Sequence, residues 1–147
     1  MIPPLVSFML ELGANSNLED STRDSAMFFV GWAITYKNSI VLQQKLMEPI
    51  FNVLFKMMLE EDADGLDIND ITPYRSACSL LDQLCISMPS KYIFNPVIGN
   101  SMKLLASDNW VHRKAGISAV GLVVEGCSEA TRKHLQNIVP HVRYFKS

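Results

Sequence analysis

Histidine and cysteine are the side chains that could bind a metal or act as a nucleophile here, and they are few and scattered. His134 and His141 are seven residues apart on one predicted helix, but no third ligand follows at a spacing typical of zinc sites. Cys127 and His134 could form a nucleophile and base, yet no residue is placed to orient the base. P-loop, GxSxG and HExxH motifs are absent. The sequence therefore predicts no catalytic residues, no metal site and no cofactor, and indicates a protein that is not an enzyme.

A run of carboxylates is the densest cluster of charge in the sequence. Residues 60–70 contain no base and carry six of the fifteen acids: Glu60, Glu61, Asp62, Asp64, Asp67 and Asp70. Such a segment can attract a basic partner and speed its capture, or it can be a solvated connection with a turn at Asp64-Gly65. A calcium loop is disfavoured, because the regular ligand alternation and the glutamate at loop position twelve are missing.

Two further residues could contact a partner. Trp110 could stack on another protein, although packing between neighbouring structural units is the favoured interpretation. Arg113 lies about one turn later and could meet an acidic partner, but an ion pair with an aspartate of a neighbouring unit is favoured. Phe28, Phe29 and Trp32 lie in an apolar stretch and are expected in the core.

The composition fits one folded domain. The chain has 147 residues, of which 48% are hydrophobic, so it can bury a core. Its net charge of -2 gives no general attraction to nucleic acid, and no apolar run is as long as a membrane span. Neither direct nucleic-acid binding nor membrane insertion is expected. Cys78 and Cys85 are two helical turns apart, too far for a disulfide, and all three cysteines are expected to be reduced.

Helical periodicity dominates the sequence, and no segment alternates with period two for long enough to predict a strand. Thr72 and Asp108 are predicted helix caps, and Pro73 is a favoured first helical residue. The segment 39–60 is expected to kink or restart near Pro49. The predicted helices span residues 3–13, 20–36 paired with 39–60, 72–87 paired with 90–106, and 108–126 paired with 128–145, with the acidic segment 60–70 as a loop.

A repeat of 44–47 residues organises these helices. Prolines recur in the second helix of each pair, each followed by apolar residues, at positions 4, 49, 96 and 140. The first helices open alike, with Arg23, Arg75 and Arg113 each followed closely by an alanine. This period is that of HEAT and armadillo repeats, which stack to bury their apolar faces. The predicted fold is therefore all-α: an α-α superhelix of about three and a half HEAT repeats, cut from a longer array.

Two consecutive stretches match a known family pattern. Residues 107–127, SDNWVHRKAGISAVGLVVEGC, contain a D-x-W opening, an Arg and small residues at helical spacing, and a closing Glu-Gly. The preceding stretch, 72–84, reads TPYRSACSLLDQL. Together they resemble middle HEAT repeats of the importin-beta, or karyopherin-beta, family over about residues 60–140. The Glu-Gly-Cys ending resembles the branch that contains importin-4 and importin-5.

The resemblance implies transport through nuclear pores. Members of the family bind protein cargo, commonly basic, and FG-repeat nucleoporins, and they release cargo on binding Ran-GTP while moving between cytoplasm and nucleus. Pore-protein phenylalanines insert between adjacent first helices, here 20–36, 72–87 and 108–126. An acidic loop contacts Ran and basic cargo, and the matching positions are Glu60, Glu61, Asp62, Asp64, Asp67 and Asp70, although uncharged residues interrupt them.

The alternative function is a generic HEAT-repeat scaffold of a phosphatase- or kinase-type assembly. Such a scaffold predicts a shorter repeat and no long acidic insertion. The period of 44–47 residues and the acidic segment 60–70 therefore favour the transport receptor.

Overall fold

The computed structural model describes residues 2–60, 66–127 and 132. All regular secondary structure in these residues is helical, which confirms the all-α prediction. The helices are α1 (Ile2–Ala14), α2 (Asp20–Tyr36), α3 (Asn38–Gln43), α4 (Met47–Met58), α5 (Pro73–Ser87), α6 (Ser90–Leu105) and α7 (Trp110–Gly126). The helix predicted over 128–145 lies outside the described residues.

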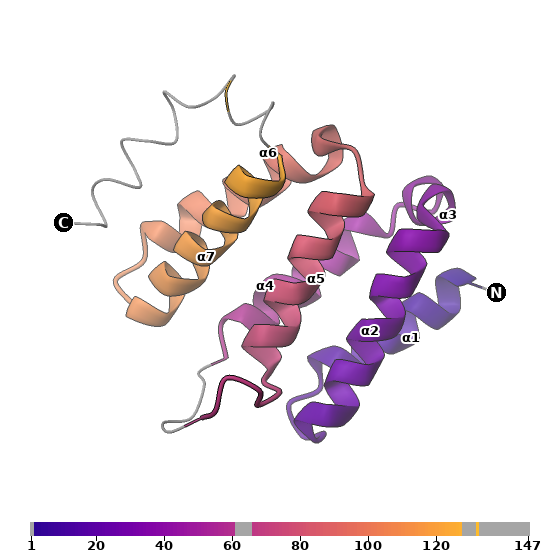
Figure 1. The fold of residues 1–147 in the computed structure, drawn as a ribbon, viewed down its shortest axis with the longest axis horizontal. Coiled ribbons are helices and arrows are strands. Elements are labelled where there is room, and N and C mark those ends of the chain that lie inside the picture. Colours follow the sequence, from indigo (N-terminus) through magenta and orange to yellow (C-terminus); the bar gives the residue numbers. More distant parts are fainter. Residues whose placement is uncertain (1, 61–65, 128–131, 133–147) are drawn as a thin grey trace.

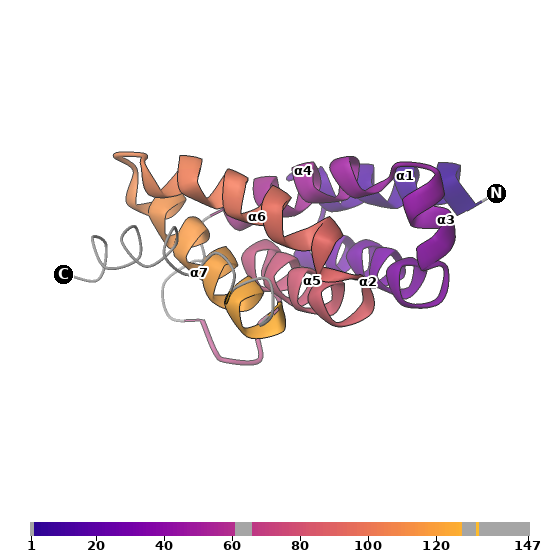
Figure 2. The same cartoon turned by 90° about the horizontal axis from the view of Figure 1, so that it is seen from above.

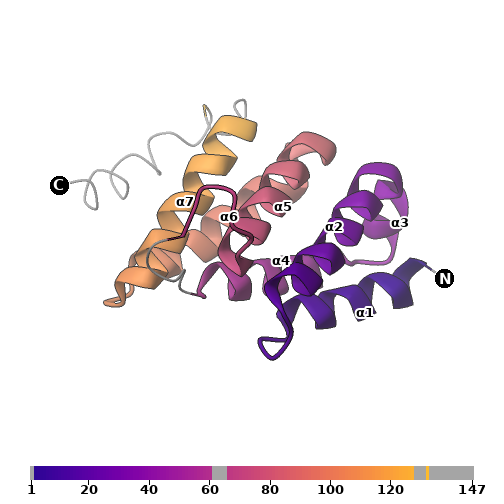
Figure 3. The same ribbon diagram turned by 60° about the horizontal axis from the view of Figure 1, so that its bottom comes forward.

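The longer helices form two layers. Helices α2, α5 and α7 lie side by side in one layer, and α1, α4 and α6 form the other (Figure 1, Figure 2). Across the layers, α1 packs on α2, α4 on α5, and α6 on α7. The tilted view in Figure 3 shows the short α3 beside the end of α2. Stacked helix pairs of this kind bury their apolar faces against their neighbours, as a superhelix requires.

Local capping explains where α5 and α7 begin. Thr72 Oγ1 accepts a hydrogen bond from Arg75 N at 3.1 Å, and Pro73 is the first residue of α5, as predicted. The cap of α7 is Asn109, whose Oδ1 accepts from Val111 N at 3.0 Å. The predicted cap Asp108 is therefore wrong by one residue. Asp108 belongs to the linker before α7, and its backbone carbonyl accepts a hydrogen bond from Arg113 Nη1.

The segment 39–60, which was expected to kink or restart near Pro49, forms two helices. Helix α3 ends at Gln43 and α4 begins at Met47, and between them Lys45 has a φ of 55°. A left-handed residue cannot continue a right-handed helix, so the chain must restart after it. Pro49 then falls in the first turn of α4, where its missing N–H has no intrahelical acceptor to lose.

The core lies between the two layers. All seven helices of the described residues contribute side chains that are fully buried there: Val6 of α1, Ile34 of α2, Val41 of α3, Leu54 of α4, Leu84 of α5, Ile93 of α6 and Val123 of α7. Burying apolar surface from successive helices in one continuous cluster gives the stacked array its stability.

Two aromatic side chains of α2 lie outside that core, which corrects the sequence prediction. Phe28 and Trp32 expose 79% and 38% of their surface, whereas Val30 and Ile34 of the same helix are buried. With 3.6 residues per turn, positions 28 and 32 share the face that α2 turns away from the other layer. Phe29 is partly buried and packs against the core.

Candidate functional site

Glu60, the first residue of the acidic segment, is engaged inside the fold. Arg23 Nη1 donates to Glu60 Oε1 at 2.9 Å, and Arg23 Nη2 also contacts Glu60 Oε2. The Arg23 side chain is 3% exposed, and its Nε donates to Gly13 O at 2.8 Å. The Glu60 carboxylate therefore fastens the end of α4 to the start of α2, and it is only partly available to a partner.

Asp67 and Asp70 shape the end of the acidic segment. Asp67 N donates to Asp70 Oδ2 at 2.7 Å, and Asn69 N donates to Asp67 Oδ1 at 3.3 Å. Arg75 Nη1 donates to the carbonyl oxygens of Asp67 and Asp70 at 2.6 and 2.8 Å. Both carboxylates remain exposed at the surface, held in place against the start of α5.

The other three acids of the predicted site, Glu61, Asp62 and Asp64, lie outside the described residues. The structure therefore brings together Asp67 and Asp70, places Glu60 in a partly buried ion pair, and leaves the role of the whole segment as a prediction.

Trp110 and Arg113 occupy the first turn of α7. Trp110 exposes 59% of its surface, so it does not pack between units in the way that the sequence favoured. Arg113 Nη1 donates to the carbonyl oxygens of Ser107 and Asp108 at 3.1 and 2.7 Å. Within the part of the chain that the structure describes, these two bonds take the place of the favoured ion pair with a neighbouring aspartate, because the linker carbonyls lie within reach of the guanidinium.

The three arginines of the sequence repeat share one structural role. Arg23 binds Gly13 O before α2, Arg75 binds two carbonyls before α5, and Arg113 binds two carbonyls before α7. An arginine fork satisfies several acceptors at once, so one side chain can fix a linker that has no regular structure. The repeated arginine thus fastens the preceding segment to the helix that carries it. This segment is the end of α1 for Arg23, and it is the linker before the helix for Arg75 and Arg113.

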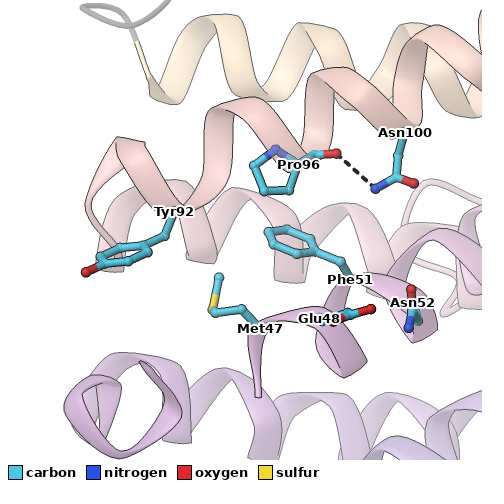
Figure 4. A pocket seen from close by; sticks show the side chains of 7 residues that line it. All are labelled: Met47, Glu48, Phe51, Asn52, Tyr92, Pro96 and Asn100. Carbon is cyan, nitrogen blue, oxygen red and sulfur yellow. Dashed lines mark hydrogen bonds between the residues drawn. The ribbon is translucent and has the colours of Figure 1, made fainter. Parts of the chain in front are cut away.

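An open groove lies between α4 and α6 in the second layer (Figure 4). Its volume is about 510 Å³, and Figure 4 shows Phe51 and Pro96 facing each other across it, with Tyr92 and Met47 toward one end. These two helices make few direct contacts, which leaves the space between them open. The lining residues are Met47, Glu48, Phe51, Asn52, Tyr92, Pro96 and Asn100.

The groove combines an apolar floor with a polar rim. Phe51 is 4% exposed and forms part of the floor, while the exposed side chains of Glu48 and Asn52 stand on α4 and Asn100 stands on α6. Asn100 Nδ2 donates to Pro96 O at 2.9 Å. Convergent polar groups around an apolar floor are typical of binding sites. Sequence reasoning missed this groove, although the recurring prolines pointed to the two helices that line it.

Exposed aromatic rings mark the opposite layer. Trp32 lies between Phe29 and Tyr36, with ring centroids 5.5 and 6.1 Å apart, and Tyr36 exposes 69% of its surface. Beside Phe28, a shallow hollow of about 80 Å³ lies between α2 and α5. Gln83 Nε2 of α5 donates to Gly31 O at 3.0 Å and to Thr35 Oγ1 at 2.7 Å, so the two helices are firmly joined there.

The described residues contain neither a metal-binding cluster nor a helix that could span a membrane. Within residues 2–60, 66–127 and 132, no group of three or more His, Cys, Asp or Glu side chains is placed to hold a metal ion. His134 and His141 fall outside those ranges. None of the seven helices combines the length and the apolar character that crossing a bilayer needs.

The known proteins to which this sequence is similar are importins. No family model matches the sequence. Probable importin subunit beta-4 of Schizosaccharomyces pombe is 26% identical over 136 residues, which are 92% of this chain and 13% of that protein. Importin-4 of Mus musculus is 23% identical over 146 residues, covering 89% of this chain and 14% of that protein. The resemblance to the importin-beta family is confirmed. Both relatives belong to the importin-4 branch that the Glu-Gly-Cys ending indicated.

Solved structures agree on the fold. Kap121p bound to RanGTP matches 97% of this chain with a TM-score of 0.81 at 19% identity, and Kap121p bound to Nup53p matches the same share with a TM-score of 0.82. The chain spans 15% of either structure. At this identity the match concerns the fold, and it confirms the predicted α-α superhelix.

Proposed function

We propose that this chain is a segment of a nuclear transport receptor that binds other proteins and catalyses no reaction. The observation that carries the proposal is its similarity to importins along nearly its whole length. Those importins support the receptor over the generic HEAT scaffold of a phosphatase- or kinase-type assembly. The protein would act in the cytoplasm, in the nucleus and at the nuclear pore.

The groove between α4 and α6 is the proposed contact for cargo. Kap121p was solved bound to the extreme C-terminus of the phosphatase Cdc14p, so a structural neighbour accepts a protein tail. Among the described residues that line the groove, Glu48 is the only charged one, and it favours a basic side chain in the cargo. Lys91 Nζ already lies 5.0 Å from the Tyr92 ring centroid, so an entering cation would pair with Glu48 rather than with that ring.

Pore-protein repeats are proposed to contact the other layer. Nup53p is the partner of Kap121p in one of the similar structures. The exposed rings of Phe28, Trp32 and Tyr36 on α2 offer apolar surface to phenylalanine side chains. These rings lie on 20–36, one of the first helices that the family resemblance singled out, and the shallow hollow beside Phe28 lies between this helix and 72–87.

Ran-GTP is proposed to contact the acidic segment, because Kap121p was also solved bound to RanGTP. The segment 60–70 supplies negative charge, and Asp67 and Asp70 present theirs at the surface. Glu60 contributes indirectly. Because Arg23 holds its carboxylate, Glu60 fixes the place where the segment begins. Exposed carboxylates act together here, each being worth little alone at physiological salt.

A pull-down with Ran tests this proposal. The chain is immobilised and offered Ran loaded with GTP or with GDP. We expect binding that prefers GTP, and weaker binding when Asp62, Asp64, Asp67 and Asp70 are all changed to alanine. The matched control changes four other acids to alanine: Glu11, Glu19, Asp20 and Glu125. Binding without preference for GTP, or equal weakening in both variants, would favour the generic scaffold and leave the acidic segment as a solvated connection.

A further inference from the structure

Two cysteines that are far apart in the sequence meet where α5 and α7 end. Cys85 lies in the last turn of α5, and Cys127 is the residue that follows α7. Both are buried, at 7% and 1% exposure. The Cys127 side chain lies close enough to the Cys85 thiol to raise its pKa.

The backbone of α7 comes unusually close to Cys85. A Cβ atom at Gly126 would stand only 2.4 Å from Cys85 Cβ and 3.2 Å from its Sγ. Real Cβ atoms do not approach this closely, so the lack of a side chain at position 126 permits the contact. The residue that directly follows, Cys127, is thereby held beside Cys85, with Cys127 N bonded to Val123 O at 2.7 Å.

We propose that Cys85 and Cys127 are a disulfide-forming pair, which a small-molecule disulfide such as oxidised glutathione converts into a covalent link between α5 and α7. The third cysteine does not compete. Cys78 lies seven residues before Cys85 on the same helix, about 10 Å along its axis, which exceeds the reach of a disulfide.

The reaction balances as two thiol–disulfide exchanges. The thiolate of one cysteine attacks oxidised glutathione, forms a mixed disulfide and releases one glutathione thiolate. The second cysteine then attacks the protein sulfur of the mixed disulfide and releases the other glutathione. The protein loses two hydrogens and glutathione gains them. Either cysteine can make the first attack, and Cys85 is the more exposed of the two.

The resting pair is reduced and reacts slowly. Burial, together with the neighbouring Cys127 thiol and the Asp82 carboxylate, raises the pKa of Cys85 from 9.0 to about 12. Since the thiolate is the reacting form, little of it is present at neutral pH. The link therefore forms under sustained oxidation, when the ends of α5 and α7 open briefly, and not during a short exposure.

The link joins neighbours within one layer of the solenoid. Helices α5 and α7 pack against each other, and their relative angle contributes to the curvature of that layer. A bond at their C-terminal ends holds those ends together. Oxidation would then restrict how far this part of the solenoid can bend.

The test is oxidation of the whole chain under native conditions. The wild-type chain and the variants C78S, C85S and C127S are incubated with oxidised glutathione, and the products are mapped by peptide mass spectrometry without reduction. We expect a Cys85–Cys127 link in the wild type and in C78S, with a mass loss of two hydrogen atoms. No internal link is expected in C85S or C127S. Circular dichroism confirms that each variant is folded.

The wild-type result alone can overturn the proposal. A native chain that stays fully reduced, that carries only mixed disulfides with glutathione, or that links Cys78 would contradict it. A Cys85–Cys127 link that forms only after denaturation would do so as well, because the folded contact would then play no part.

Discussion

Arg23 is the most buried cation among the described residues, and it serves two acceptors from different parts of the chain. Its partners Gly13 and Glu60 are ten and thirty-seven residues away. Removing one member of such a pair leaves the others without a donor, and this costs more than the intact pair contributes. The contacts among the end of α1, the start of α2 and the end of α4 therefore depend on the Arg23 side chain.

Changing Arg23 to methionine keeps buried volume but removes every donor. We expect the free energy of unfolding to fall by about 3 kcal/mol, because Gly13 O and the Glu60 carboxylate lose their partner. Urea denaturation followed by circular dichroism measures the change. The control Glu60→Gln keeps an acceptor and should cost about 1 kcal/mol. Similar losses in the two variants would contradict the view that Arg23 serves two sites.

Two glycines of α7 allow a matched pair of substitutions. Gly126→Ala places a Cβ 2.4 Å from Cys85 Cβ, and we expect this overpacking to destabilise the fold by about 2 kcal/mol. Gly121→Ala meets nothing within 4 Å, and it should stabilise the helix by about 0.5–1 kcal/mol, since alanine has the higher helix propensity. Thermal unfolding gives both values. Changes of the same sign would show that the contact at Gly126 is looser than the structure indicates.

The break between α3 and α4 is centred on one strained residue. Lys45 holds a φ of 55°, where a side chain clashes with its own backbone. The turn is needed because α4 must lie against α1 and α5, while α3 stays at the end of α2. Packing of the longer helix thus decides the conformation of the short linker.

Glycine at position 45 should relieve that strain. We expect Lys45→Gly to raise the free energy of unfolding by about 1 kcal/mol, because glycine adopts positive φ without cost. The neighbouring Gln44 has a φ of -88°, so Gln44→Gly should lower stability slightly through the entropy of the unfolded chain. Guanidinium denaturation of both variants is the measurement. A loss of stability in Lys45→Gly would mean that the lysine side chain makes contacts worth more than the strain.

The two layers of the molecule differ in how closely their helices pack. Helix α5 packs against both α2 and α7, so the first layer is closed across its described helices, whereas the second layer opens into the groove between α4 and α6. A stacked array with one closed and one open face presents different chemistry on each. The closed face carries exposed aromatic rings, and the open face carries a carboxylate above an apolar floor.

Binding of a lysine-rich peptide tests the open face, and fluorescence anisotropy gives the affinity. We expect Glu48→Gln to weaken binding about threefold and to reduce its salt dependence, because one exposed charge pair is lost. Glu125→Gln removes an exposed carboxylate from the other layer and should leave the affinity unchanged. Equal affinities for the wild type and Glu48→Gln would exclude the groove as the site for a basic side chain.

Local signals in the sequence determined the helices themselves. Thr72 and Pro73 marked the start of α5, because a cap depends on residues within one turn, and the recurring arginines and prolines indicated a stacked all-α array. Pro49 likewise indicated the restart that the structure shows at Met47. The same local reasoning failed at Phe28 and Trp32, because the positions of neighbouring helices decide which side chains are exposed.

Only the tertiary structure decided which distant residues meet. Glu60 pairs with Arg23, which is thirty-seven positions away in the sequence. Cys127 lies beside Cys85, although the sequence predicted no partner for Cys127. The groove likewise exists because α4 and α6 stand apart, a distance that depends on how both rest on the other layer. Helix formation follows from interactions along the chain, whereas the register of one helix on another follows from how side chains interlock. The periodic pattern therefore specified the elements, and packing specified the surfaces that they present.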